Sequence, residues 1–309
     1  MKIGLVGVGR WGKNILNTIM EIDDITLSCV TSNRKNIRDL IPIDCSVYQK
    51  WDEMINHPNL EGIIISTPPK THYLIAQNAL LKGIPVLVEK PLTLNIQEAL
   101  DLRRISESKQ TLLMTEFTQV YNPKFTQLKK SLKLVGDIRK IETIANNFGP
   151  VRKDTPVLWD WGSHELSILI SLLEEIPISI EARKIKEKVN ILGEASSWDI
   201  VCKFKNKITS YSSISNIDKK IRKVTVIGTK GIIVLDDLGK YPLQFHKEKI
   251  IEEFPNMVGK EIYIEKKEKP LFVALTNFFN CIRNKEIRHW SLDLGVEVTE
   301  LLAQCSKNF

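Results

Sequence analysis

The chain has 309 residues, 43% hydrophobic and 26% charged, a composition typical of soluble globular proteins and long enough for two domains with separate cores. The net charge is +7, but residues 1–120 carry 13 basic and 13 acidic side chains, so the excess lies in the second half. The lysines there alternate with apolar residues, as on the solvent face of a sheet, which argues against a nucleic-acid-binding protein.

The amino terminus and the cysteines indicate in which cellular compartment the protein is expected. Lys2 and the apolar residues after it imitate a signal peptide, but Arg10 interrupts them and no small-residue cleavage site follows. No later apolar run approaches the roughly 20 residues that a membrane-spanning helix requires. The cysteines are scattered, without a CxxC pair or a histidine at zinc-binding spacing: Cys29, Cys45, Cys202, Cys281 and Cys305. We expect a cytoplasmic protein with free thiols, no membrane contact and no metal.

The chain opens with a glycine-rich turn between a predicted strand, residues 2–6, and a predicted helix, residues 13–20. The pattern is G-x-G-x-x-G, and the residues expected to contact a dinucleotide are Gly7, Gly9, Arg10, Trp11 and Gly12. In this motif the first glycine makes a tight turn, the second lets the backbone approach the pyrophosphate, and the third lets the helix pack closely. The helix N-terminus adds positive potential. The sequence therefore predicts dinucleotide binding rather than a plain glycine turn.

A second strand, predicted over residues 25–30, ends in Thr31, Ser32, Asn33 and Arg34. NAD-selective sites usually carry Asp or Glu there, which binds both ribose hydroxyls. Small polar groups followed by a cation could accept a 2′-phosphate instead. The alternative is a helix start capped by Ser32 or Asn33. The pattern favours NADP(H) as the cofactor, with NAD(H) as the other candidate.

Two further apolar strands, residues 62–65 and 85–88, flank a predicted helix over 72–82. The second of these strands ends in Glu89, Lys90 and Pro91, so a cation lies at the carboxyl edge of the sheet, where ligands bind in open α/β sheets. Alternatively, Lys90 only extends from the rim of the sheet into solvent, and the proline ends the strand. Next come a helix capped by Asn95 and a strand over residues 111–115.

Beyond residue 120 the predicted strands follow one another with few helices between them. They cover residues 138–146, 178–182, 198–204, 208–214, 224–228 and 232–235, and helices are predicted over 125–134, 270–283 and 293–305. We expect an α/β protein with a Rossmann NAD(P)-binding domain, residues 1–120, and an α+β substrate-binding and oligomerisation domain, residues 121–309. The second domain would hold a mainly antiparallel open sheet, through which a homodimer or homotetramer would form.

The segment from Val157 to His164 leads into an apolar helix that ends near Leu173. If the whole segment is helical, Asp160 and His164 lie four residues apart on one face, so that a carboxylate could orient an imidazole. Histidine is the side chain best suited to take and return a proton near neutral pH. The alternative is that Asp160 caps the helix and His164 is a hydrogen-bonded core residue.

Taken together, these motifs resemble the glucose-fructose oxidoreductase, inositol dehydrogenase and MocA (Gfo/Idh/MocA) family. The residues that carry the resemblance are the three glycines, the segment STPPKTH from Ser66 to His72, the tripeptide Glu89-Lys90-Pro91, and Asp160-x-Gly162-x-His164. The resemblance implies an NAD(P)-dependent oxidoreductase that acts on hydroxyl or keto groups of sugars, polyols or nucleotide-sugars. The sequence of residues 159–167, WDWGSHELS, is most similar to that of members associated with bacterial surface-carbohydrate biosynthesis.

The resemblance also implies residue roles. Lys90 would polarise the substrate oxygen, His164 would act as general acid and base, and Asp160 would orient it or bind substrate. Further contacts with the cofactor would come from Thr67, Pro68, His72, Glu89 and Lys90, and with the substrate from Lys90, Asn122, Asn147, Arg152, Asp160 and His164. The family often continues this helix as H-x-x-D, where this chain has Ser167. One substrate hydroxyl contact of the family is therefore in doubt here.

A second hypothesis is a non-catalytic dinucleotide-binding regulator that uses the same fold as a redox sensor. A sensor has no need of a proton relay, so the presence of Lys90, Asp160 and His164 in one chain favours the enzyme.

Overall fold

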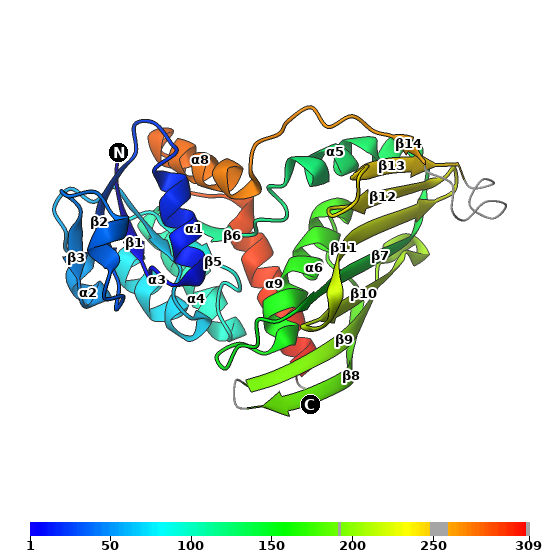
Figure 1. The fold of residues 1–309 in the computed structure, drawn as a ribbon, viewed down its shortest axis with the longest axis horizontal. Coiled ribbons are helices and arrows are strands. Elements are labelled where there is room, and N and C mark those ends of the chain that lie inside the picture. Colours follow the sequence, from blue (N-terminus) through cyan, green and yellow to red (C-terminus); the bar gives the residue numbers. More distant parts are fainter. Residues whose placement is uncertain (191–192, 248–258, 307–309) are drawn as a thin grey trace. The chain divides into compact units, whose positions relative to one another are not determined.

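The structure is a computed structural model that describes residues 1–190, 193–247 and 259–306 (Figure 1). The chain folds into two compact units: unit 1 comprises Met1–Thr118 and Lys269–Ala303, and unit 2 comprises Gln119–Glu268 and Gln304–Phe309. The division after Thr118 lies beside the expected boundary at residue 120. The expected division placed the segment Lys269–Ala303 in the second domain, whereas its helices pack with unit 1.

Unit 1 is built on a parallel six-stranded sheet with the order β3-β2-β1-β4-β5-β6. Its strands are β1 (Lys2–Val6), β2 (Thr26–Thr31), β3 (Ser46–Tyr48), β4 (Gly62–Ile65), β5 (Val86–Glu89) and β6 (Leu113–Glu116). The expected Rossmann sheet is confirmed. Strands β1, β4 and β5 are apolar apart from Lys2 and Glu89 at their ends because helices cover both faces of the sheet, and Ile3, Leu5 and Ile63 are fully buried. The chain order reverses at β1 and β4, which is the position where such sheets bind ligands.

The helices of unit 1 are α1 (Arg10–Ile19), α2 (Trp51–Met54), α3 (His72–Leu81), α4 (Ile96–Lys109), α8 (Pro270–Arg283) and α9 (Trp290–Ser306), whose last residues belong to unit 2. Short 3-10 turns cover Ile37–Leu40 and Pro69–Thr71. The Asn95 side chain caps α4 by accepting a hydrogen bond from the Gln97 amide at 2.7 Å. Helix α8 contacts the sheet so closely that a Cβ on Gly62 would lie 2.8 Å from Ile282 Cδ1.

Unit 2 contains an eight-stranded sheet with the order β14-β13-β12-β11-β7-β10-β9-β8. Its strands are β7 (Ile138–Phe148), β8 (Ser179–Asn190), β9 (Gly193–Lys203), β10 (Thr209–Ser215), β11 (Ile217–Gly228), β12 (Ile232–Asp236), β13 (Leu243–His246) and β14 (Lys260–Glu261). The expected antiparallel character is confirmed, with one exception: β7 and β10 pair in parallel. Helices α5 (Pro123–Ser131) and α6 (Val157–Leu173) lie on one side of this sheet (Figure 1), and 3-10 turns cover Leu132–Leu134 and Lys205–Lys207.

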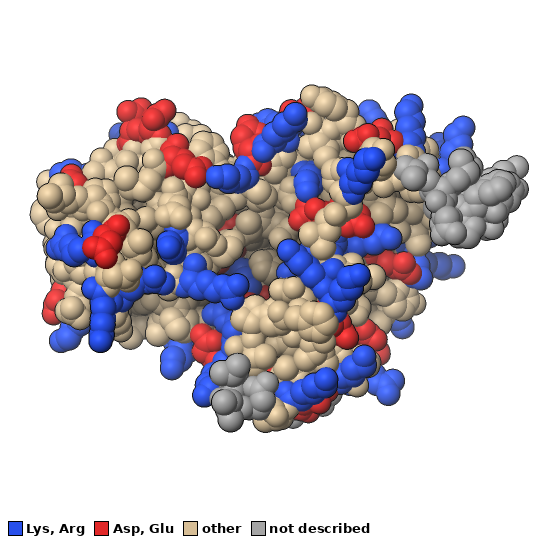
Figure 2. Space-filling model, viewed as in Figure 1, with Lys and Arg blue, Asp and Glu red and all other residues tan. Residues whose placement is uncertain are grey.

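The hydrophobicity of the helices and the distribution of surface charge can be compared with the expectation of no membrane and no nucleic-acid partner. None of the helices in the described ranges is both long enough and apolar enough to cross a membrane. On the face shown in Figure 2, lysine and arginine side chains are spread out and interspersed with acidic ones. On this face the excess positive charge of the second half is therefore not gathered into one basic patch.

Candidate active site

Glycine occupies each of the three positions of the first turn for a different physical reason. Gly7 has a φ of +94°, which disfavours any side chain, and its amide donates to the Thr31 carbonyl at 3.0 Å. A Cβ on Gly12 would lie 2.1 Å from the Gly7 carbonyl oxygen, so the helix can approach the turn only without a side chain there. A Cβ on Gly9, which caps α1, would meet no heavy atom within 4 Å. The protein's own packing does not require Gly9, so its lack of a side chain fits a ligand that approaches the N-terminus of α1.

A cavity of about 760 Å³ lies beside this turn, entirely within unit 1. It is lined by Val6, Gly7, Val8, Gly9, Thr31, Ser32, Asn33, Arg34, Gln49, Lys50, Trp51, Asp52, Ser66, Thr67 and Pro68. Seven of the residues predicted to bind the cofactor lie among them: Gly7, Gly9, Ser32, Asn33, Arg34, Thr67 and Pro68. The glycine turn and the carboxyl ends of β1, β2 and β4 therefore converge on one cavity whose size suits a nucleotide.

Arg34 is held over the glycine turn. Its Nε donates to the Val8 carbonyl at 3.3 Å, and its backbone amide donates to Ser32 Oγ at 3.2 Å. The alternative of a capped helix start is not what the structure shows, because the next helical turn begins at Ile37 and its capping residue is Asn36. Lys50 adds a second cation to the cavity wall, and Asp52 is the one carboxylate among the lining residues.

His72 lies inside unit 1 rather than on the cavity wall. Its ring is fully buried, with Nδ1 2.9 Å from the Pro91 carbonyl oxygen and Nε2 2.9 Å from the Thr67 carbonyl oxygen. We therefore assign the ring to holding the loop after β4 against the segment after β5. In this way His72 positions Thr67 and the residue next to Lys90 instead of contacting the dinucleotide.

Glu89 and Lys90 end strand β5, as predicted. The Glu89 side chain is buried and accepts a hydrogen bond from Trp11 Nε1, so the first turn of α1 is tied to this strand end. Lys90 is half-buried, and its peptide bond with Pro91 is cis. Burial is the main cause that raises the pKa of Glu89, and the neighbouring Glu116 raises it further. Arg10 and Trp11 are both exposed at the start of α1.

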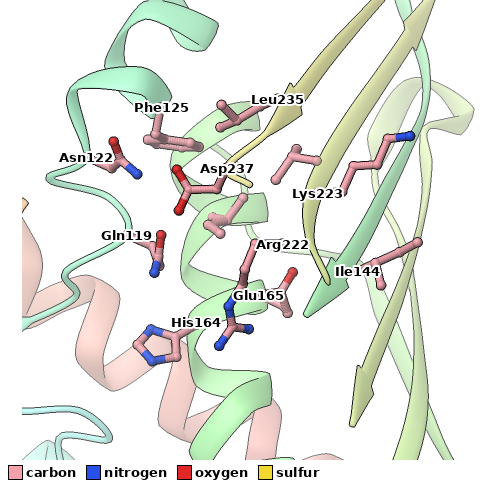
Figure 3. Close-up of a pocket in the computed structure, with 12 residues that line it drawn as sticks. Gln119, Asn122, Phe125, Ile144, His164, Glu165, Arg222, Lys223, Leu235 and Asp237 are labelled. Atoms are coloured by element: carbon pink, nitrogen blue, oxygen red, sulfur yellow. The ribbon is translucent and has the colours of Figure 1, made fainter. Parts of the chain in front are cut away.

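In unit 2, helix α6 spans Asp160 and His164, so the predicted helical spacing is confirmed. The helix is capped by Pro156, and Asp160 is therefore not its N-cap. His164 borders a small cavity of about 40 Å³ within this unit (Figure 3). Its wall consists of Gln119, Asn122, Phe125, Ile144, His164, Glu165, Ile168, Arg222, Lys223, Val224, Leu235 and Asp237. Figure 3 shows His164, Arg222 and Gln119 directed toward the same space from α6, β11 and the segment before α5.

Arg222 is the main charged group beside His164. Its guanidinium lies 4.0 Å from the centre of the Trp161 ring. Burial lowers the pKa of Arg222, while the carboxylates of Glu165, Asp237 and Asp160 oppose that change. Glu165 is itself buried, which raises its pKa, although the field of Arg222 acts in the other direction. The cavity therefore combines donors and acceptors with a compensated cation, an arrangement suited to hydroxyl groups.

The predicted substrate residues of unit 2 fall into two groups. Asn122 lines the cavity and is buried, and its side-chain oxygen accepts from the Lys124 amide at 3.0 Å. Asn147 and Arg152 are not among the lining residues. The Asn147 side chain donates to the Gly149 carbonyl at 3.1 Å, and Arg152 forms ion pairs with Asp154 at 3.3 Å and with Asp160 at 3.5 Å.

Several polar residues of these sites were not predicted. They are Lys50 and Glu116 in unit 1, and Gln119, Glu165, Arg222 and Asp237 in unit 2. Glu165 follows His164 directly and is the last charged residue before the apolar end of helix α6, a pattern that could have pointed to it. Arg222 lies in a lysine-rich stretch that reads as a solvent face. Within the described ranges, no three His, Cys, Asp or Glu side chains are grouped so that they could hold a metal ion.

Comparison with known proteins shows the family to which this chain belongs. Residues 1–117 match the sequence profile of the Gfo/Idh/MocA group, described as an oxidoreductase family with an NAD-binding Rossmann fold. A crystal structure from Magnetospirillum magnetotacticum MS-1, described as that of an oxidoreductase, is 30% identical, covers 99% of both chains and superposes with a TM-score of 0.91. The chain belongs to the Gfo/Idh/MocA oxidoreductase family. Members of this family bind an NAD(P) dinucleotide through the Rossmann unit.

More distant relatives include enzymes that are named for their substrates. The scyllo-inositol 2-dehydrogenase (NADP(+)) of Bacillus subtilis is 24% identical over 204 residues, which are 62% of this chain and 56% of that protein. The matches with this relative and with an oxidoreductase of Schizosaccharomyces pombe span about half the length of those proteins. The UDP-N-acetylglucosamine 3-dehydrogenase of Acidithiobacillus ferrooxidans is 19% identical, covers 99% and 96% of the two chains, and has a TM-score of 0.82, so it shares the fold.

Proposed function

We propose that the protein is an NAD(P)-dependent oxidoreductase that transfers a hydride between a nicotinamide cofactor and a hydroxyl or keto carbon of a sugar, polyol or nucleotide-sugar. The observation that carries the proposal is the turn around Gly9, which the protein's packing leaves open in front of α1, next to a cavity formed by three strand ends. Dinucleotides bind at this position in doubly wound sheets. The residues of the cavity therefore fit the cofactor that the family uses.

Within this proposal, NADP(H) is the preferred cofactor. No carboxylate follows β2 in residues 31–36, whereas Arg34 is held at the cavity by its bond to Val8 and Lys50 lies in the same wall. A guanidinium can bind a phosphate through two parallel hydrogen bonds, which suits it to the 2′-phosphate. The test is to titrate the protein with NADPH and NADH and follow nicotinamide fluorescence.

We expect NADPH to bind more tightly, and Arg34→Ala to weaken NADPH binding by about tenfold or more with little effect on NADH. Arg104→Ala is the matched control, because Arg104 is exposed on α4 and pairs with Asp101 at 2.6 Å. Markedly tighter binding of NADH to the native chain would contradict the preference.

The roles of the reacting residues follow from their chemistry. The nicotinamide, when bound, supplies or accepts the hydride. The Lys90 ammonium would stabilise negative charge that develops on the substrate oxygen, and His164 would hold or take up the hydroxyl proton. Asp160 would position substrate or His164, and Arg152, which pairs with it, would act through Asp160. Asn122 would bind a substrate hydroxyl at the wall of the unit 2 cavity.

The substrate class rests on the polar wall around His164 and on the family. Amide, carboxyl and guanidinium groups line this cavity, and such groups pair readily with the hydroxyls of a sugar or polyol. Relatives named for their activity on scyllo-inositol and on UDP-N-acetylglucosamine act on the same chemical class. A role in bacterial surface-carbohydrate biosynthesis would suit a substrate of this kind.

The decisive experiment screens inositols, free sugars and UDP-sugars for NADP+ reduction, followed by variants on the best substrate. We expect Lys90→Ala and His164→Ala each to lower kcat by about a hundredfold or more, with cofactor affinity retained in His164→Ala. Lys109→Ala, at the exposed end of α4, is the control. Full turnover in the two variants would refute the roles of Lys90 and His164. Tight dinucleotide binding without turnover on any member of the panel would favour the redox sensor instead.

A further inference from the structure

Two glutamates lie side by side at the carboxyl edge of the unit 1 sheet. Strands β5 and β6 are parallel neighbours, and Glu89 is the register partner of Glu116. Neighbouring strands lie about 4.8 Å apart, and register partners point to the same face. Both side chains are buried, with 8% of Glu89 and 1% of Glu116 exposed. Two carboxyl groups are thus held close together in a site from which water is largely excluded.

The hydrogen bonds that the two carboxyl groups accept leave one buried oxygen atom without a donor among the described residues, and a shared proton can lie there. Trp11 Nε1 donates to Glu89 Oε1, and Thr118 Oγ1 donates to Glu116 Oε2 at 2.6 Å. The Glu116 Oε1 atom is buried and receives no hydrogen bond from an N–H or hydroxyl group of the described residues. A proton carried by the neighbouring Glu89 could satisfy this oxygen, and burial together with the nearby charge of Glu116 raises the pKa of Glu89 in that direction. The geometry therefore favours an acid at Glu89 that donates to a carboxylate at Glu116.

Lys90 is the charged neighbour of both groups. Burial raises the pKa of each glutamate, and the field of the Lys90 ammonium opposes that change in both. Two ionised carboxylates at this distance would repel each other without water to screen them, whereas a pair with one proton carries a single negative charge. That single charge balances the single positive charge of Lys90.

We propose that Glu89 and Glu116 share one proton and act as a positioning pair, which gives the Lys90 ammonium a single buried counter-charge. The proposal deepens the proposed function, since it explains how a cation is kept in place at the edge of a sheet where the substrate oxygen would be polarised. Trp11 and Thr118 fix the pair from two sides, so the charge is anchored to the glycine turn and to the end of β6.

The shared proton is measured first, in the full chain without cofactor or substrate. Infrared spectra at neutral pH are compared for the native chain, Glu89→Gln and Glu116→Gln, with 13C-labelled glutamate to assign the carbonyl stretch of a protonated carboxyl group. We expect this band in the native chain and its loss in both single variants, because the single remaining carboxyl group is then the counter-charge of the Lys90 ammonium and stays ionised. Glu107→Gln, an exposed position on α4, keeps the band. Glu165 is also buried, so Glu165→Gln identifies any second band.

The coupling to Lys90 is measured through the reactivity of its amine. Only an uncharged amine reacts with an acylating reagent, and an adjacent carboxylate favours the ammonium form. We expect Lys90 acylation, followed by peptide mass spectrometry, to proceed at the native rate in each single variant, which keeps one carboxylate. In Glu89→Gln/Glu116→Gln the rate should rise at least threefold, while the rate at the exposed Lys109 stays constant.

The absence of a protonated band from the pair in the native chain, or an unchanged Lys90 rate in the double variant, would overturn the proposal. If the double variant does not fold, the infrared result of the single variants still decides the shared proton. Neither measurement uses turnover, so a failure to find a substrate would count against the proposed function and leave the carboxyl pair standing.

Discussion

At the scale of single residues, His289 shows how a buried neutral histidine supports the sheet of unit 1. Its ring is buried before α9, and Ser291 donates its backbone N–H to His289 Nδ1 at 3.2 Å. Ser291 Oγ lies 2.8 Å from the same nitrogen and accepts from the Thr115 amide on β6 at 3.1 Å. A proton on Nδ1 would remove the acceptor of this chain of bonds. His289 is thus a link between α9 and the strand that carries Glu116.

This link predicts a pH dependence of stability. Burial lowers the pKa of His289 to about 4, below the ordinary value of 6.5. Between these values the unfolded chain binds more protons than the folded one, so stability rises with pH in this window and is lost as pH falls. We expect His289→Asn to reduce this slope, with a difference on the order of 2 kcal/mol accumulated between pH 7 and pH 4. Urea unfolding across that range measures it, and identical slopes in the two chains would contradict it.

At the scale of elements, the glycine turn allows two substitutions to be compared. Gly12→Ala brings a methyl group against the Gly7 carbonyl, which cannot move without opening the turn, so a loss of about 3 kcal/mol in stability is expected. Gly9→Ala meets open space and should cost less than about 1 kcal/mol, the usual cost of alanine at a helix cap. Gly9→Ala should nevertheless weaken dinucleotide binding at least tenfold. Urea unfolding and NADPH titration of both variants test this, and normal NADPH binding by Gly9→Ala would refute the placement of the cofactor.

The elements also show what the sequence can predict. Strands of unit 1 such as Gly62–Ile65 were predicted because burial on both faces makes them continuously apolar. Strands β13 and β14 were missed because they are short and carry little alternation. Arg222 was missed because it lies in the charged stretch 218–223, although it stands two and four residues before the buried Val224 and Val226 on β11. Alternation along β11 therefore puts Arg222 on the same face as these two valines, which is the face toward the helices.

At the scale of the whole molecule, contacts between segments that are distant in sequence determine the fold and the arrangement of the site residues. The helices at 270–283 and beyond 290 were predicted as helices, but nothing in their pattern indicates that they pack on unit 1. The apolar face of each helix can be buried against any apolar surface, so the complete fold determines which unit the helices pack on. The neighbours Glu89 and Glu116 likewise become partners only through the strand order β5-β6, because 26 residues separate them in the chain.

Among the residues that the structure describes, one face of the unit 2 sheet carries no helix of that unit (Figure 1). The expected homodimer or homotetramer would use this face. A row of register partners crosses five strands on this face, and each is at least partly exposed: Val201, Tyr211, Glu142, Thr225 and Val234. The adjacent row, which faces the helices, is buried: Cys202, Ser210, Ile141, Val226 and Ile233. Tyr211, the second residue of the outer row, is 47% exposed and lies between Val201 and Glu142. An exposed aromatic side chain beside a valine on such a sheet face is typical of an interface between subunits.

We therefore expect light scattering at micromolar concentration to give the mass of a dimer or tetramer, and Tyr211→Glu to give a smaller assembly. The added carboxylate would lie near Glu142 and its copy in a partner, and a buried unpaired charge costs several kcal/mol at an interface. Tyr263→Glu is the control, because Tyr263 is exposed outside the sheet. A native chain that is monomeric at this concentration would refute assembly through this face. A Tyr211→Glu variant with the native mass would show that the subunits meet elsewhere.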